Sequence, residues 1–344
     1  MTTDSVRART KLRVGHIVFG AFSTFCLLLI LRNTDTAIEY MTRGLLLCAR
    51  TVIPSLFPFM VLSELIVSGG FADRIFSRIS LPFRILLRLP TVGCCAVLLG
   101  ILCGFPIGVR CAMLAYDKGL LSKRECETVC IAASTPSSAF LISAVGASLW
   151  GNRTFGIALY GCAVTASLLT GILFGHLRAT KGEIRITEQP QARVTLGGAR
   201  LFTAAIRSAT ESILQVCAYV VFFSALTGTL NLILSRMGAS QTITVLLTSF
   251  FELSSGVSGA VGLSHGIPGA MLCAATVGWS GLSVHCQLLS LCDGRGFSMK
   301  PYFAAKLLQA LLCAGSLALL LRLFPDLTCA AESCACADDW LYLL

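Results

Sequence analysis

Residues 103–108, CGFPIG, interrupt an apolar run that extends from residue 89 to residue 109 without a charged side chain. Residues 134–138, STPSS, interrupt the next uncharged run. The second half of the chain has the same kind of interruption at residues 252–259, ELSSGVSG, and at residues 278–285, GWSGLSVH. Proline removes a backbone N–H and glycine disfavours the helical well, so these four stretches predict breaks in α-helices.

The composition indicates an integral membrane protein. Charged residues make up 13% of the 344 residues and the mean hydropathy is +0.80, whereas soluble domains are about 25% charged. A bilayer crossing needs about 20 apolar residues. Uncharged runs recur at residues 14–31, 89–109, 128–152, 154–177, 212–235 and 253–292. Residues 51–69 and 303–324, which contain Glu64 and Lys306, are also apolar. We expect an all-α polytopic membrane protein with about eight to ten membrane segments, some of them broken or re-entrant.

The positions of the four breaks point to transport. Broken helices at matching places in two halves of a membrane chain are a sequence sign of a carrier's binding site. Backbone groups freed by a break cannot face lipid, so they line a polar cavity. The sequence therefore predicts a protein that moves a small solute across a membrane.

The order of segments predicts two halves. The expected organisation is an N-terminal anchor span (1–35), a first half (36–177), a polar linker (178–200), a second half (201–324) and a Cys-rich tail (325–344). Each half offers a helix of mixed character, two broken segments and an unbroken apolar span. This shared order predicts an internal duplication.

The basic residues are explained by the membrane. Arg7, Arg9, Lys11 and Arg13 precede the first span, which predicts a cytoplasmic N-terminus by the positive-inside rule. A cleaved signal peptide is the alternative. The net charge of +10 comes without a nucleic-acid-binding motif, so we expect lipid headgroups and no nucleic acid as partners. Residues 71–89 read as an amphipathic helix in the membrane interface.

Hydroxyl side chains gather at all four breaks and predict a site for a small anionic solute. They are Ser134, Thr135, Ser137, Ser138, Ser254, Ser255, Ser280 and Ser283. Helix N-termini beside them can bind an anion without a basic side chain. Each serine alone is more often a helix-packing residue. Gln287 is a further candidate substrate-binding residue.

Three ionisable residues complete the predicted site. Arg110 could hold an anion through two hydrogen bonds, or extend to the cytoplasmic face. Glu252 could couple transport to protons, or cap the helix that follows it. His285 could face a cavity, or be a neutral histidine bonded to a helix carbonyl. Glu64 and Glu211 could pair with arginines such as Arg110 or Arg207.

The sequence argues against an enzyme, a cofactor and a metal site. It has no phosphate-binding loop and no HExxH motif, so we expect no catalytic residue. Most of the 17 cysteines lie in apolar spans, where cysteine behaves as a small hydrophobe. Cys329, Cys334 and Cys336 in the tail lack the paired C-x2-C spacing of a zinc site.

Several motifs resemble those of the YlbJ family of sporulation integral membrane proteins, also called SpoVV, between about residue 36 and residue 324. They are residues 52–59 (VIPSLFPF), 62–65 (LSEL), 103–108 (CGFPIG), 121–127 (LSKRECE), 134–138 (STPSS), 279–287 (WSGLSVHCQ) and 300–303 (KPYF). The family's corresponding elements include SGYPxG, LTxxEAE, WSGLSVHxQ and KPFF. The WSGLSVHCQ stretch is the most specific of these matches.

The resemblance implies a function. The family belongs to the wider nucleoside-recognition or Gate-domain group, which is similar to the concentrative nucleoside transporters. It implies transport of dipicolinic acid across the outer forespore membrane during endospore formation. The chain lacks the family's Asn residues near residues 134–138 and has a Cys-rich tail, so a different small anion is an alternative substrate.

The sequence leaves two more functions open. One is a carrier of nucleosides or of another small solute, and the other is a non-transporting assembly protein of sporulation. The cell membrane is the alternative location, and a homo-oligomer is compatible with the sequence.

Overall fold

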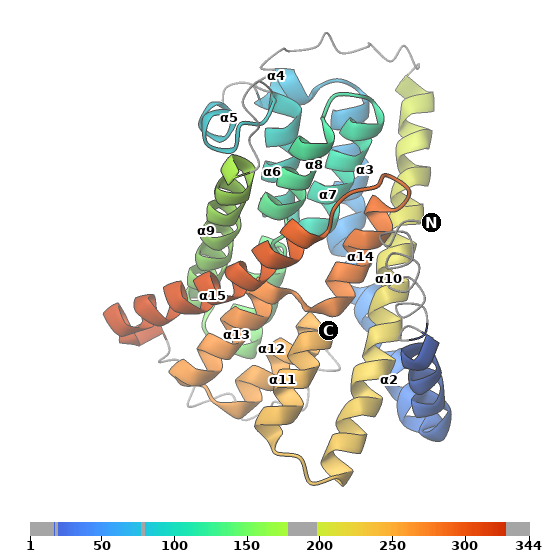
Figure 1. Ribbon diagram of the computed structural model, residues 1–344, viewed down its shortest axis with the longest axis vertical. Helices are drawn as coiled ribbons and strands as arrows, with labels where there is room; N and C mark the ends of the chain where they lie inside the picture. The colour runs from blue at the N-terminus through green and yellow to red at the C-terminus, as the bar shows by residue number, and fades with distance from the viewer. Residues whose placement is uncertain (1–16, 18–19, 77–79, 178–197, 328–344) are drawn as a thin grey trace, which may run out of the picture.

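The computed structural model describes residues 17, 20–76, 80–177 and 198–327. Within these residues the protein is all α-helical and has no strand, as the sequence predicts (Figure 1). The basic N-terminal residues, most of the polar linker and the cysteines of the tail lie outside the described residues.

The first half of the chain contains a long helical segment, a hairpin, a broken segment and a second long helix. The elements are α2 (Thr34–Leu47), the π-helical η1 (Cys48–Val52), α3 (Ile53–Ser68), α4 (Ala72–Phe76), α5 (Leu81–Leu87), α6 (Thr91–Cys103), α7 (Phe105–Asp117), α8 (Lys123–Ala132), the π-helical η2 (Phe140–Leu149) and α9 (Arg153–Leu177). A further helix, Gly20–Arg32, precedes them. Helices α2, η1 and α3 follow one another without an interruption.

The second half repeats this order. Its elements are α10 (Gly198–Arg236), α11 (Gln241–Phe251), α12 (Leu253–Leu263), α13 (Ile267–Trp279), α14 (Gly281–Cys292), α15 (Lys300–Leu323) and the short η3 (Pro325–Leu327). Helix α10 packs against α2 and α3, and α15 packs against α9 and α13. The expected order of elements is thus present in both halves, while the duplication behind it stays a prediction.

Four helical segments of the described chain are long and apolar enough to cross a membrane. They are Arg153–Leu177, Gly198–Arg236, Ile267–Cys292 and Lys300–Leu323. The pair Leu81–Leu87 and Thr91–Cys103, bent by 100°, makes a fifth candidate. The expected eight to ten membrane segments are therefore not matched by full-length helices, since the described residues have four or five candidate spans and their other apolar helices are 10–17 residues long. Many leucines on α9 and α15 are exposed, as lipid-facing positions require.

Helices α6 and α7 form the first hairpin, which turns at Gly104. This residue has a φ of +102°, a backbone conformation that favours glycine. Gly100 and Gly108, at equal distances from the turn, touch through their backbones: a Cβ on Gly108 would lie 2.6 Å from the Gly100 Cα. The glycines let the two arms approach more closely than any larger residue would allow.

Helices α11 and α12 form the second hairpin, which turns at Glu252. A Cβ on Gly256 would lie only 2.5 Å from the Ser249 Cα of the facing arm. Figure 1 shows the first hairpin in the upper half of the molecule and the second in the lower half. Helices α14 and α15 pass between them.

The other two breaks interrupt helices. Helix α8 ends at Ala132 and helical structure resumes at Ser138, so the break at residues 133–137 includes most of the STPSS stretch. Helices α13 and α14 form one 26-residue span broken at Ser280, which has a φ of +73°. All four sequence interruptions therefore fall at helix breaks.

Residues 71–89 do not form the single amphipathic helix that the sequence suggested. Helices α4 and α5 are separate, and α5 starts with proline in its first turn and ends at Arg88 in the left-handed region. Helix α5 buries Leu87 and exposes Leu81, Ile85 and Leu86. Its apolar exposure and its 100° angle to α6 fit a position in the membrane interface.

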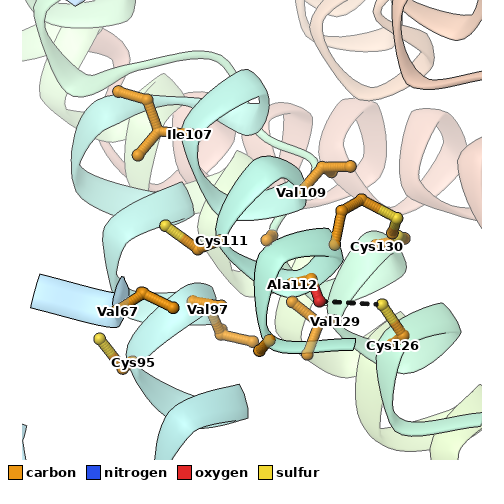
Figure 2. Packing of buried hydrophobic residues seen from close by; sticks show 14 of the residues in the cluster. Val67, Cys95, Val97, Ile107, Val109, Cys111, Ala112, Cys126, Val129 and Cys130 are labelled. Carbon is orange, nitrogen blue, oxygen red and sulfur yellow. Dashed lines mark hydrogen bonds between the residues drawn. The ribbon is translucent and has the colours of Figure 1, made fainter. Parts of the chain in front are cut away.

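The apolar core around the first hairpin is built from small residues. Figure 2 shows Val97, Ile107, Val109, Cys111 and their neighbours packed together, with the Cys126 thiol donating to the Ala112 carbonyl at 3.4 Å. The cysteines of the described residues are free, and most are buried. The prediction that they pack as small hydrophobes is confirmed.

Candidate functional site

The tip of the first hairpin meets the break between α8 and η2. The Phe105 N–H donates to the Thr135 carbonyl at 2.8 Å. A Cβ on Gly104 would lie 3.2 Å from the Ser137 nitrogen, so the two backbones are in contact. The first two breaks of the sequence therefore form one structure.

The tip of the second hairpin meets the break between α13 and α14 in the same way. Gly281 has a φ of +80°, and a Cβ there would lie 3.0 Å from the Leu253 nitrogen and 3.1 Å from the Glu252 Cα. The positive φ and the close approach both require glycine at this position.

Lys306 of α15 joins the two pairs of breaks. Its side chain is 1% exposed. Its ammonium group donates to the Ser134 carbonyl, the Ser280 hydroxyl and the Gln309 amide oxygen, each at 2.9 Å. Three acceptors match the three N–H donors of a lysine. One nitrogen atom therefore connects the α8–η2 break to the α13–α14 break, and all four breaks converge.

Side chains of α9 and α15 donate hydrogen bonds to the backbone carbonyls that the α8–η2 break leaves free. The Gln309 amide donates to the Ile131 carbonyl at 3.1 Å and to the Thr170 hydroxyl at 2.8 Å. The Ser167 hydroxyl donates to the Ala132 carbonyl at 2.9 Å. The last carbonyls of a helix have no partner within it, and here the two packed helices supply the partners.

Arg110 is buried and does not extend to a membrane face. Its guanidinium pairs with the Glu64 carboxylate at 2.5 Å and donates to the Ser208 hydroxyl at 2.6 Å and the Met60 carbonyl at 3.2 Å. These contacts fix α7 to α3 and α10. The pairing of Glu64 with Arg110, left open by the sequence, is present, as is an exposed pair between Arg207 and Glu211.

A small pocket with a cavity volume of about 10 Å³, roughly the room for one water molecule, lies beside the tip of the first hairpin. Phe105 and Arg110 of α7, Gln215 and Tyr219 of α10, and Gln287 of α14 line it. The amide of Gln287 donates weakly to the Ser283 hydroxyl at 3.4 Å, while its oxygen is buried without a protein partner. An unpaired buried polar atom is costly and marks a place for a ligand or water. Two predicted site residues, Arg110 and Gln287, thus share one pocket.

Glu252 caps the second arm of its hairpin. Its carboxylate accepts hydrogen bonds from the Ser254 N–H at 2.9 Å and the Ser255 N–H at 2.6 Å. The capping role considered for this residue is therefore present. A role in proton coupling stays a prediction.

His285 lies in an aromatic setting between α14 and α15. Its Nδ1 is 3.1 Å from the Tyr302 hydroxyl, and its ring packs edge-on against Trp279 and Phe303. No helix carbonyl takes this ring nitrogen, and Nε2 is buried without a partner. His285 does not line the pocket beside Arg110.

The remaining predicted hydroxyls serve mainly the backbone at the α8–η2 break. The Ser134 hydroxyl donates to the Ile131 carbonyl at 3.2 Å, and the Ser138 hydroxyl to the Leu102 carbonyl at 3.0 Å. The Ser137 hydroxyl accepts from the Phe140 N–H at 3.2 Å. The Thr135 hydroxyl is buried and has no partner. These residues hold the break together, which is the packing role expected of single serines.

Lys306 is the residue that sequence reasoning missed, although it was visible as a charge inside an apolar span. An ionisable residue at membrane depth is a functional candidate by default. The same rule makes His285 and Glu252 candidates from the sequence, and it should also have included Lys306.

The chain is 24% identical, over 340 aligned residues, to the sporulation integral membrane protein YlbJ of Bacillus subtilis (strain 168). The alignment covers 88% of this chain and 82% of the relative. This similarity supports the resemblance to the YlbJ family that the motifs indicate. The motif resemblance to YlbJ is confirmed, and with it the assignment as an integral membrane protein. No family model and no solved structure matches the chain.

Proposed function

We propose that this protein is a membrane carrier for a small anion, with dipicolinate as the first candidate substrate. One observation carries the proposal: each hairpin tip meets a helix break, and the buried ammonium of Lys306 joins the two breaks. Such an arrangement is costly in lipid and has a purpose in a protein that must hold a polar solute within the membrane.

The lining of the pocket beside Arg110 suits a small aromatic anion, and the pocket would have to widen to admit one because its cavity holds about one water molecule. Dipicolinate is a planar pyridine ring with two carboxylates. Phe105 and Tyr219 offer ring surfaces, and the Gln215 and Gln287 amides can donate to a carboxylate. Arg110 adds a positive group, although Glu64 already pairs with it. A bound carboxylate would then compete with Glu64 for Arg110 or bind beside the intact pair.

A nucleoside carrier is the second candidate. The two amides of the pocket suit the polar edge of a nucleobase, and the Arg110–Glu64 pair is neutral as a whole. A non-transporting assembly protein would have no use for the pocket or for an ammonium at the meeting point of four breaks.

The location follows from the same proposal. The relative's name describes a sporulation protein, so we place this carrier in the outer forespore membrane or the cell membrane, with a cytoplasmic N-terminus. Protease accessibility of an N-terminal tag in sealed vesicles tests the orientation.

Uptake into liposomes tests the function. Purified protein is reconstituted into vesicles that contain Tb³⁺, whose luminescence rises when dipicolinate enters. Luminescence should rise with protein and not in empty vesicles, and excess uridine should leave the rate unchanged. Uptake of labelled uridine without dipicolinate would favour the nucleoside carrier, and entry of neither solute would contradict transport.

A variant connects uptake to the pocket. Gln287→Leu should slow dipicolinate entry about tenfold, because it removes the amide that faces the pocket. Glu211→Gln, on an exposed part of α10, serves as the matched control and should leave the rate unchanged. Equal rates in both variants would place the substrate elsewhere.

A further inference from the structure

The ammonium of Lys306 has no carboxylate partner among the described residues. Its three hydrogen bonds end on neutral oxygens: a backbone carbonyl, a hydroxyl and an amide. Removing a charged group from water costs several kcal/mol, and buried charges are normally paired. Something other than an acidic side chain must therefore stabilise a positive charge here.

Two helix ends supply that stabilisation. Helix α8 ends at Ala132 and helix α13 ends at Trp279, and Lys306 bonds to Ser134 and Ser280 just beyond these ends. The C-terminal end of a helix carries about half a negative charge. Because both ends lie within reach of the Lys306 nitrogen, together they make a site for a single positive charge.

The same set of ligands is what a small cation takes in a coupled carrier. Unwound backbone carbonyls and the C-terminal ends of half-helices coordinate Na⁺ in such proteins. Here the carbonyl of the unwound residue Ser134, the Ser280 hydroxyl and the Gln309 amide oxygen surround the Lys306 nitrogen instead. The lysine occupies all three of these oxygens, so none is left for a free cation. The positive charge of the lysine also repels a free cation.

We propose that Lys306 is a tethered cation that occupies the position of a coupling Na⁺, so that the protein works without a Na⁺ gradient. As a statement about coupling, this rests on the proposed carrier function. As a statement about cation binding, it stands on the hydrogen bonds of Lys306 alone.

The thermal unfolding of the purified protein in detergent tests cation binding without any substrate. The melting temperature of the native protein should be the same in NaCl and in choline chloride at equal ionic strength. Lys306→Ala removes the ammonium and opens space beside the three oxygens, so its melting temperature should rise with NaCl and not with choline chloride. A Na⁺ response of the native protein, or a folded Lys306→Ala protein that ignores Na⁺, would overturn the proposal.

A second variant covers the case in which Lys306→Ala does not fold. Lys306→Gln keeps more of the side-chain volume, and its yield of folded protein should be higher when NaCl replaces choline chloride during purification. Equal yields in the two salts would contradict the proposal.

A separate transport experiment tests the statement about coupling. Dipicolinate entry into vesicles should proceed at the same rate with and without Na⁺ for the native protein, and should become Na⁺-dependent for Lys306→Ala. If no solute enters but the melting temperatures respond as described, the carrier function fails while the cation site stands.

Discussion

The two hairpins have the same outline but are attached to the rest of the protein in different ways. Arg110 binds the α6/α7 hairpin to α3 and α10, and the Tyr160 hydroxyl of α9 donates to the Ile101 carbonyl at 2.9 Å. In the described chain, one side-chain hydrogen bond reaches the α11/α12 hairpin from another element, from the Trp279 indole to the Phe250 carbonyl at 3.0 Å. Glu252 bonds only within its own hairpin.

In the proposed carrier, this difference suggests which hairpin stays fixed and which one moves. Alternating access needs a fixed part and a part that moves against it. The α6/α7 hairpin, held by a buried ion pair, suits the fixed part. The α11/α12 hairpin, whose outer arm exposes Ile243, Leu246 and Phe250, suits the moving part. We expect the second hairpin to open and close the site.

Breaking the Glu64–Arg110 ion pair of the first hairpin should cause the largest loss of stability. Glu64→Gln leaves the buried Arg110 guanidinium without its carboxylate, which should cost about 3–5 kcal/mol of stability. Thermal or denaturant unfolding of the purified protein measures the loss. The same substitution in the exposed pair, Glu211→Gln, is the control: its partners are 84% and 70% exposed, so it should cost roughly 0.5 kcal/mol or less. Equal losses would show that Arg110 does not anchor the hairpin.

Alanine in place of the glycine at the closest contact of each hairpin should destabilise the protein to different extents. Gly108→Ala places a Cβ within 2.6–2.9 Å of Gly100, Ala133 and Ala96 on two neighbouring helices. Overpacking of this kind costs about 1–3 kcal/mol. Gly256→Ala also clashes, with Ser249, but the less anchored hairpin can shift to relieve it. The melting temperature should therefore fall more for Gly108→Ala.

A third glycine controls for the change of residue type. A Cβ added to Gly161 on α9 would meet no atom within 4 Å, so Gly161→Ala should be neutral or stabilise the protein by about 0.4–1 kcal/mol. A larger loss for Gly256→Ala than for Gly108→Ala would reverse the assignment of fixed and moving hairpins.

Glu252 should affect transport more than stability. Glu252→Gln weakens the cap of α12 and should cost about 1 kcal/mol, while changing the tip of the hairpin that we expect to move. Dipicolinate uptake into vesicles at several pH values measures its role. A flatter pH profile than that of the native protein is expected if the carboxylate takes part in a proton-linked step. An unchanged rate and profile would leave Glu252 as a cap alone.

Breaking the Arg295–Asp117 pair, which connects the first hairpin to the α14–α15 loop, should cause the smallest loss of stability. Arg295 donates to Asp117 at 2.6 Å and 2.8 Å, and its guanidinium lowers the pKa of the Asp117 carboxyl. Because the folded-state pKa is the lower one, the pair stabilises the protein above the ordinary value of 3.8. This contribution is lost as the pH falls through the lowered pKa.

Asp117→Asn measures that contribution. The pair is partly exposed, so the substitution should cost roughly 0.2–1 kcal/mol at pH 7. The difference in melting temperature from the native protein should shrink below about pH 4. A difference that grows on acidification would contradict the direction of the shift.

The helix breaks could be predicted because their cause is local. Glycine, proline and serine act on the backbone at their own positions, and all four interruptions fall at helix breaks. The short turn between α12 and α13 has the same local cause, since residues 264–266 combine Ser, His and Gly and Pro268 follows them.

The tertiary arrangement could not be predicted in the same way. The contact between Lys306 and Ser134 joins residues 172 positions apart, and no local pattern encodes it. Hydropathy also cannot distinguish a crossing from a hairpin arm. The uncharged run of residues 253–292 begins with the 11-residue helix α12, which folds back on α11 and does not cross as a full span.

Hydrogen–deuterium exchange, read by mass spectrometry with and without dipicolinate, tests the division between the two hairpins most directly. Amide exchange reports local opening. We predict faster exchange in Gln241–Phe251 and Leu253–Leu263 than in Thr91–Cys103 and Phe105–Asp117, with protection by dipicolinate confined mainly to the second hairpin. Equal exchange in the two hairpins, or protection of the first alone, would contradict the account.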